Sequence, residues 1–292
     1  MTALEPPLHG AEGPDRFDST GQLLALITAQ LSSQLSRVTL NGSGRPPVLV
    51  LVAHGSRDPG ASRTAHALTD AVRALRPGLT VRLGHLDLDE PLLDDTLAAL
   101  RRDAVLVPLM LAHGHHVTAG IPRVLARAAH PGGRIAAALG PHALLAEALH
   151  DRLTEAGWRV PRPRDAHRAG VVLAAAGSRD PRSARDTART AALLQARLGG
   201  GVPVVPAYTR AGPGVADAVR ALAAAGRHDI AVASCFAAPG RHAAAAAAAA
   251  PGIAAAPLGA HPSVAALVLH RYDRALSAAG GPASTATRLA TA

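Results

Sequence analysis

The 292-residue sequence predicts an α/β protein made of two similar, tandem, doubly wound domains, each with a four-stranded parallel sheet, flanking helices, and a cleft between the domains. Three observations lead to this prediction. Short apolar runs alternate with stretches of helical periodicity. The first run, VLVLVA, is apolar throughout, as in a strand covered on both faces. The pattern then restarts near residue 168, and the length suits two domains of roughly 150 residues each.

Residues 1–47 precede this pattern and are predicted to form an extension. Apolar residues recur at helical spacing over residues 23–38, which predicts one amphipathic helix, and the segment NGSGRPP at 41–47 is typical of a linker. This helix could dock on the body, dimerise or recruit a partner. The first 18 residues carry acids and no apolar stretch, so we expect no secretory signal and a cytoplasmic location. No run of about 20 strongly apolar residues predicts a membrane span.

The next segment alternates strands and helices four times, which is typical of a parallel sheet with right-handed crossovers. Each strand is a short apolar run, and each helix is a longer stretch with apolar residues at helical spacing. The expected strands are 48–53, 80–86, 104–111 and 134–139, and the expected helices are 60–75, 91–101, 119–129 and 143–157.

The second half of the chain repeats the first, which indicates an internal duplication. The phrase GSRDP recurs at an offset of 122 residues, and further matches follow in the same order. The matched segments are VLVLVAHGSRDP with GVVLAAAGSRDP, AHGHHV with APGRHA, and LGPH with LGAH. We therefore predict a first domain at 48–158, a second at 168–280 and a flexible tail at 281–292. Two such halves imitate a two-fold dimer, so we expect a monomer.

The repeated GSRDP turn is expected to serve the fold in both halves. Asp58 and Asp180 stand where helix N-caps belong, each followed by the proline favoured at the first helical position. The N–H groups of the turn, with Arg57 or Arg179, predict a seat for an anion. The residue before the motif differs between the halves, since His54 is matched by an alanine. A histidine present in only one of two similar turns is poorly explained by folding.

Several histidines and acids lie where predicted strands end, which indicates a metal site. In a sheet of order 2-1-3-4, ligands gather beyond the carboxyl ends of strands one and three. His54 ends strand one, the run His113–His116 follows strand three, and Asp87 and Asp89 follow strand two. Imidazoles with a carboxylate suit a first-row divalent ion such as Fe²⁺, Co²⁺ or Ni²⁺. The second half has His242 at the position of His116 but lacks the other groups, so we expect one site per chain.

Structural roles remain open for each of these residues. His54 could be a hydrogen-bonded core histidine, and His116 a surface residue. His113 and His115 could lie outside the ligand set. Asp87 could be a ligand or could cap a turn, and Asp89 is expected in a solvated turn or at the start of the next helix.

These motifs together resemble the sirohydrochlorin and cobalt chelatase family, the class II tetrapyrrole chelatases, in its long, internally duplicated bacterial form. The resemblance spans about residues 48–280. It rests on AHGSRDP, LDLDEPLL, VPLMLAHGHHVTAGIP and LGPH.

The resemblance implies insertion of Fe²⁺ or Co²⁺, with Ni²⁺ a further option, into sirohydrochlorin without ATP or an organic cofactor, in sirohaem or cobalamin biosynthesis. It implies that His54 and His116 hold the metal and are catalytic, with Asp87 as a further ligand. Where the family commonly has an acid before Ile-Pro, this chain has Gly120. The substrate has a carboxylate-rich rim, which suits arginine. The expected substrate-binding residues are Ser56, Arg57, Gly114, His115, Arg123 and Arg179.

Composition narrows the alternatives. Aromatic residues are 2% of the chain, which argues against a stacking platform for nucleic acid, and the net charge of +9 suits an acidic small ligand at least as well. One cysteine, Cys235, excludes a disulfide or an all-cysteine metal site within one chain. Two other functions compete with the chelatase: a non-catalytic carrier of metal or tetrapyrrole, and a phosphoryl-transfer or mutase enzyme that uses His54.

Overall fold

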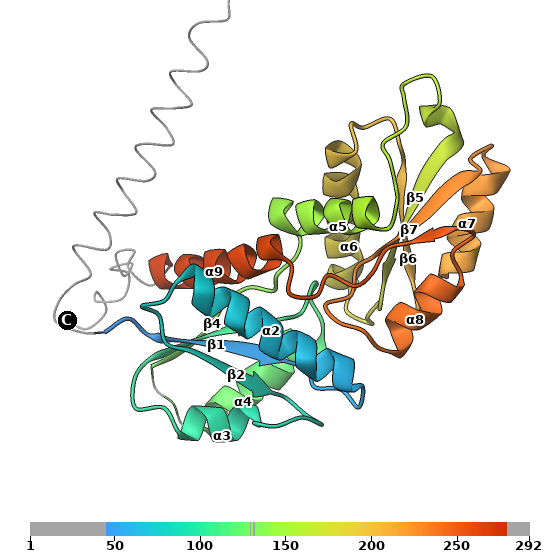
Figure 1. Cartoon of the computed structure of the whole chain (residues 1–292). Helices are drawn as coiled ribbons and strands as arrows, with labels where there is room; N and C mark the ends of the chain where they lie inside the picture. Colours follow the sequence, from blue (N-terminus) through green and yellow to red (C-terminus); the bar gives the residue numbers. More distant parts are fainter. Residues whose placement is uncertain (1–44, 129, 131, 279–292) are drawn as a thin grey trace, which may run out of the picture. The chain divides into compact units, whose positions relative to one another are not determined.

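The computed structural model describes residues 45–128, 130 and 132–278 of the chain. The predicted amphipathic helix and the predicted C-terminal tail lie outside these residues. The contacts of the chain group the described residues from Pro47 onward into one compact unit. Within this unit, the two predicted sheets are present (Figure 1).

The first half forms a four-stranded parallel sheet of order β2-β1-β3-β4, as the sequence predicts. β1 lies in the middle of the sheet, and all six of its residues are buried, which explains its uninterrupted apolar sequence. The elements in chain order are β1 (Val48–Ala53), α2 (Pro59–Leu75), β2 (Val81–His85), α3 (Leu93–Ala98), β3 (Ala104–Pro108), the π-helix η1 (His116–Gly120), α4 (Ile121–Arg127), β4 (Gly133–Ile135) and α5 (Ala143–Glu155).

The second half repeats this arrangement, with a parallel sheet of order β6-β5-β7-β8. The central strand is again fully buried. The elements are the 3-10 helix η2 (Ala166–Arg168), β5 (Ala169–Ala175), α6 (Pro181–Arg197), β6 (Val204–Tyr208), α7 (Val215–Ala224), β7 (Asp229–Ser234), α8 (Arg241–Ala248), β8 (Ile253–Ala254) and α9 (Pro262–Ser277).

The GSRDP turn starts the first helix of each half, as predicted. The Asp58 carboxylate accepts a hydrogen bond from the Gly60 N–H (2.8 Å), and Asp180 accepts one from the Arg182 N–H (2.9 Å). Proline occupies the first helical position in both. This local motif therefore sets the direction in which each helix leaves its sheet.

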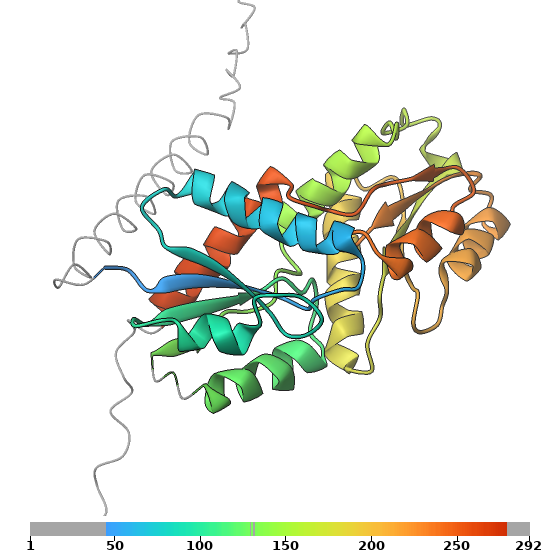
Figure 2. The ribbon, with the colours of Figure 1, turned by 60° about the horizontal axis from the view of Figure 1, so that its bottom comes forward.

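The last helix of each half packs on the other half. α5 follows the first sheet in the chain but contacts α6 and β7, and α9 follows the second sheet but contacts α2 and β3. Figures 1 and 2 show α9 beside α2, and α5 beside the second sheet. The packing of these two helices therefore crosses the predicted boundary between the two repeats.

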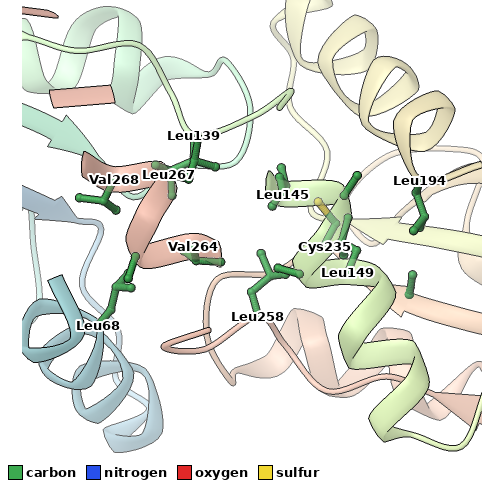
Figure 3. Close-up of a cluster of buried hydrophobic side chains, with 14 of the residues drawn as sticks. Leu68, Leu139, Leu145, Leu149, Leu194, Cys235, Leu258, Val264, Leu267 and Val268 are labelled. Atoms are coloured by element: carbon green, nitrogen blue, oxygen red, sulfur yellow. The ribbon is translucent and has the colours of Figure 1, made fainter. Parts of the chain in front are cut away.

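This exchange produces one hydrophobic core that both halves share. Buried residues from both halves and both exchanged helices belong to a single cluster, among them Leu68, Leu149, Leu194 and Val268 (Figure 3). Cys235 lies in the same cluster, where burial raises the pKa of its thiol to about 12, so the thiol is inert at neutral pH.

Polar contacts stabilise the exchanged helix α9 against the first half. Arg76, the C-cap residue of α2, donates two hydrogen bonds to the Asp273 carboxylate on α9 (2.7 and 2.8 Å). The Tyr272 hydroxyl donates to the Pro47 carbonyl at the start of the first half (2.7 Å). These contacts join segments about 200 residues apart in the chain. No helix in the described part of the chain has the length and apolarity needed to span a membrane.

Candidate functional site

Two histidines meet at the carboxyl ends of neighbouring strands. β1 and β3 pair in parallel, His54 directly follows β1, and His116 begins η1 after β3. Their ring centroids lie 4.2 Å apart, with 39° between the ring planes. His54 is exposed and His116 is half-buried. The structure thus brings together the two rings that the strand order places at one edge.

The turn after β2 packs directly on the turn that holds His54. The Asp87 N–H donates to the His54 carbonyl (3.1 Å). Gly55 has a φ of +94°, and a Cβ there would lie 1.6 Å from the Asp87 carbonyl oxygen, so only glycine permits this approach. The Asp87 side chain is exposed and accepts a hydrogen bond from the Leu88 N–H (2.8 Å). Its backbone is therefore held beside His54 while its carboxylate faces solvent.

The pKa of His116 is lowered below its usual value of 6.5. Burial is the largest cause, followed by the charges of His54, His115 and Arg210, while Asp87 opposes them. The ring is therefore more fully neutral at pH 7 than an exposed histidine would be. A neutral imidazole can bind a metal ion or accept a proton.

The described residues contain two of the three predicted metal ligands close together, His54 and His116. Among the described residues, no group of three or more His, Cys, Asp or Glu side chains is close enough to hold a metal ion together. The histidine pair is assembled, whereas the participation of Asp87 as a third ligand stays a prediction.

Three N–H groups in and directly after the first GSRDP turn are already paired, so they do not belong to the predicted anion seat. The Ser56 N–H donates to the Asp89 carboxylate (2.9 Å), and the Asp58 N–H donates to the Ser56 hydroxyl (3.1 Å). The Gly60 N–H is taken by Asp58. Asp89 therefore fastens the turn rather than lying free in solvent, and the guanidinium of Arg57 is what this turn can offer an anion.

A groove of about 890 Å³ opens beside this turn, and all of its lining residues belong to the first half. Positive, negative and hydroxyl side chains share it. The lining residues are Ser56, Arg57, Pro59, Ser62, Arg63, His66, Ala67, Asp70, Leu88 and Asp89. Two of the expected substrate-binding residues, Ser56 and Arg57, thus face a space large enough for a ligand.

The second half holds the loop that leads to His116. Asp186 on α6 accepts two hydrogen bonds from His113 on the same carboxylate oxygen, one from the backbone N–H (2.8 Å) and one with the ring Nδ1 (2.6 Å). Its side chain is only 8% exposed. Sequence reasoning missed Asp186, and no local signal marks it, because the buried face of α6 also carries the polar residues Ser183, Thr187 and Thr190.

The remaining expected residues lie at different distances from the histidine pair. The ring of His115 is exposed and its centroid lies 6.0 Å from that of His116. A Cβ at Gly114 would lie 3.5 Å from the hydroxyl of Ser178, which directly precedes the exposed Arg179. Arg123 is exposed on α4, and the structure brings it into no described contact with the pair.

The two halves touch through equivalent turns. The loop of Gly114 in the first half meets the GSRDP turn of the second half at Ser178. Reciprocally, a Cβ at Gly60, after the first GSRDP turn, would lie 3.5 Å from Pro239, before α8. The carboxyl ends of the two sheets are therefore adjacent around the histidine pair.

Comparison with known proteins shows that both halves match the same protein family. The family model described as CbiX matches residues 48–156 and again 170–275. Two sirohydrochlorin cobaltochelatases are similar over 81 residues, one from Methanocaldococcus jannaschii (36% identical) and one from Methanopyrus kandleri (32% identical). Each match covers 26% of this chain and 57% of the relative's length, which is under two thirds.

Solved structures share the fold over most of the chain. SirB from Bacillus subtilis with Fe³⁺ has a TM-score of 0.63 at 24% identity, covering 80% of this chain and 98% of that one. A structure of CbiX described as the terminal enzyme of sirohaem biosynthesis in denitrifying bacteria has a TM-score of 0.61 at 24% identity, covering 79% and 99%. At these identities the structures support the fold alone.

Proposed function

Because the chain belongs to the CbiX family, we propose that it inserts a divalent metal ion, Fe²⁺ or Co²⁺, into a sirohydrochlorin-type tetrapyrrole without ATP. The metal is a substrate of this reaction. The single observation that carries the proposal is the pairing of His54 with His116 at the ends of adjacent strands, with ring centroids 4.2 Å apart. The sirohydrochlorin cobaltochelatases among the relatives point to the same chemistry.

The spacing of the two rings fits a shared metal ion. With metal–nitrogen bonds of about 2.1 Å, the ion would lie about 3.2 Å from each ring centroid. Centroids 4.2 Å apart then subtend about 80° at the metal, near the angle between adjacent ligands in octahedral coordination. Two imidazoles leave further positions for water or for the pyrrole nitrogens of the incoming ring.

The proposed reaction needs both a metal holder and a proton acceptor. Insertion forms bonds from the metal to the ring nitrogens and releases two pyrrole N–H protons. His116 would first hold the ion, and once the ion has moved to the macrocycle its freed nitrogen could take one proton. The lowered pKa of His116 supports the metal-binding step, because a protonated imidazole cannot bind the ion. Water reached through the exposed His54 side would take the second proton.

The proposed roles of the other residues follow from their places. Asp87 would be a further ligand or would attract the cation from its exposed position beside His54. Ser56, Arg57, Gly114, His115, Arg123 and Arg179 would contact the macrocycle. One chain would suffice, because its two halves imitate the two subunits of a dimer.

The test is metal insertion by the purified full-length protein, without ATP and without oxygen. Co²⁺ and metal-free sirohydrochlorin are mixed, and the change in visible absorbance is compared with the rate without protein. His54→Ala and His116→Ala should each slow insertion at least about 10²-fold. His228→Ala is the matched control, because this exposed histidine lies at the amino end of β7 in the second sheet, whereas His54 and His116 follow the carboxyl ends of strands in the first sheet.

Two results would contradict the proposal. A near-normal insertion rate in either histidine variant would contradict the assignment of His54 and His116 as the site of metal insertion. Wild-type protein that binds Co²⁺ by equilibrium dialysis but does not exceed the protein-free rate would be a carrier. Initial rates with Fe²⁺ and Co²⁺ then decide between a sirohaem and a cobalamin role.

A further inference from the structure

The second half has an arginine at the position equivalent to Asp87. In the first half, the Asp87 N–H donates to the His54 carbonyl (3.1 Å). In the second half, the Arg210 N–H donates to the Ala176 carbonyl (3.0 Å). His54 and Ala176 are themselves equivalent, since each directly precedes a GSRDP turn. The two halves therefore carry an acid and a base at the same point of the fold.

The carboxyl end of the second sheet offers fewer metal-binding side chains than that of the first. Ala176 has no ligand atom. His242, the counterpart of His116, has its Nδ1 within 3.0 Å of the Thr209 hydroxyl. Arg241, the first residue of α8, directly precedes His242 and is exposed, which adds a second positive charge. A cation in place of the Asp87 carboxylate makes this position suitable for an anion.

Arg210 lies close to the histidine pair of the first half. The adjacent turns are in contact, since a Cβ at Gly114 would lie 3.5 Å from Ser178. The backbone of Arg210 is bound to Ala176, two residues before Ser178, and Gly114 lies two residues before His116. The positive charge of Arg210 is also among the causes that lower the pKa of His116 and of His242. Its side chain is exposed, and within the described residues it has no ion pair or hydrogen bond that would occupy it. Arg182, by contrast, is paired with Asp180.

We propose that Arg210 binds a carboxylate on the rim of the tetrapyrrole and so orients the macrocycle over the His54–His116 pair. In this arrangement the first half holds the metal and the second half recognises the anionic substrate. A planar guanidinium can donate two parallel hydrogen bonds to one carboxylate. This inference rests on the proposed function, and it adds a residue that neither the motif set nor the family resemblance identified.

The test separates binding of the macrocycle from binding of the metal. Metal-free sirohydrochlorin is titrated by absorbance into wild type, Arg210→Ala and Arg210→Lys, and Co²⁺ binding is measured separately. Losing a hydrogen-bonded ion pair of this kind should weaken tetrapyrrole binding about 10- to 100-fold. The tetrapyrrole affinity of Arg210→Lys should lie between those of wild type and Arg210→Ala, because an ammonium group keeps the charge but loses the paired donors. Co²⁺ affinity should change less than about threefold.

Arg197→Ala is the matched control for loss of one positive charge. Arg197 is exposed at the last position of the 17-residue helix α6, about 24 Å along the helix axis from the turn. It should bind the tetrapyrrole like wild type. An Arg210→Ala dissociation constant within twofold of wild type, or an equal loss in Arg197→Ala, overturns the inference.

The outcomes also distinguish the inference from the proposed function. Wild type that metallates sirohydrochlorin while Arg210→Ala binds it normally overturns the role of Arg210 only. Wild type that neither binds nor metallates sirohydrochlorin overturns both. A rise in KM with little change in kcat for Arg210→Ala supports a role in binding rather than chemistry.

Discussion

Removing the Asp186 carboxylate is expected to loosen the loop that carries His116. Asp186 belongs to the second half, yet one of its oxygens receives both hydrogen bonds from His113, three residues before His116. Its side chain is 8% exposed, whereas that of His113 is 35% exposed. The anchor therefore lies in a largely buried setting, where a lost acceptor leaves its donors unpaired.

The size of the effect follows from these two bonds. A hydrogen bond to a charged group contributes about 1.5–3 kcal/mol, and the partial exposure of His113 favours the lower end. Asp186→Ala should lower the free energy of unfolding by about 3 kcal/mol, whereas His113→Ala, which keeps the backbone bond, should lose about 1.5 kcal/mol. The double variant should resemble Asp186→Ala, giving a coupling energy of about 1.5 kcal/mol.

The assay combines urea unfolding with the cobalt insertion rate for the two single variants and the double variant. Insertion by Asp186→Ala should fall at least about tenfold, because a small displacement of a reacting group is costly. Asp229→Ala is the control, since its ion pair with Arg168 is exposed and should contribute under about 1 kcal/mol. A coupling energy below about 0.5 kcal/mol, or an unchanged insertion rate in a folded Asp186→Ala protein, would refute the anchoring role.

Three further predictions concern stability. Tyr272→Phe should cost about 1–2 kcal/mol of unfolding free energy, because the Pro47 carbonyl loses its donor; thermal unfolding checks this, with Tyr208→Phe as the control expected to change little. Leu149→Ala, at a fully buried position of the shared core, should lower the free energy of unfolding by about 2–5 kcal/mol and keep a single unfolding transition. The control Leu193→Ala, at an exposed position, should leave the free energy of unfolding nearly unchanged. Two separate transitions in Leu149→Ala would contradict a shared core. The melting temperature should fall from pH 7.5 to pH 5.5, because histidines with lowered pKa bind fewer protons in the folded state than in the unfolded state below their usual value of 6.5; a constant or rising melting temperature would contradict this. These histidines are His116, His142, His242 and His270.

The repeated α/β pattern and the capped GSRDP turns were predictable from the sequence. Strand order and the position of His54 and His116 at neighbouring strand ends follow from local features: an apolar run, a cap, a proline and a crossover. Each of these depends on residues close together in the chain. Their prediction succeeded because hydrogen-bonding and steric preferences act over a few residues.

The packing of α5 and α9 was decided only by the tertiary structure. Both helices have an apolar face that either sheet could bury, so the periodicity of the sequence is the same for exchanged and unexchanged packing. The roles of Asp186 and Arg210 likewise depend on the tertiary structure. Asp186 acts on a loop 73 residues earlier, and Arg210 matches Asp87 only when the backbone hydrogen bonds of the two turns are compared. Contacts between distant segments depend on which surfaces are brought together in three dimensions, and no local pattern of residue types encodes that choice.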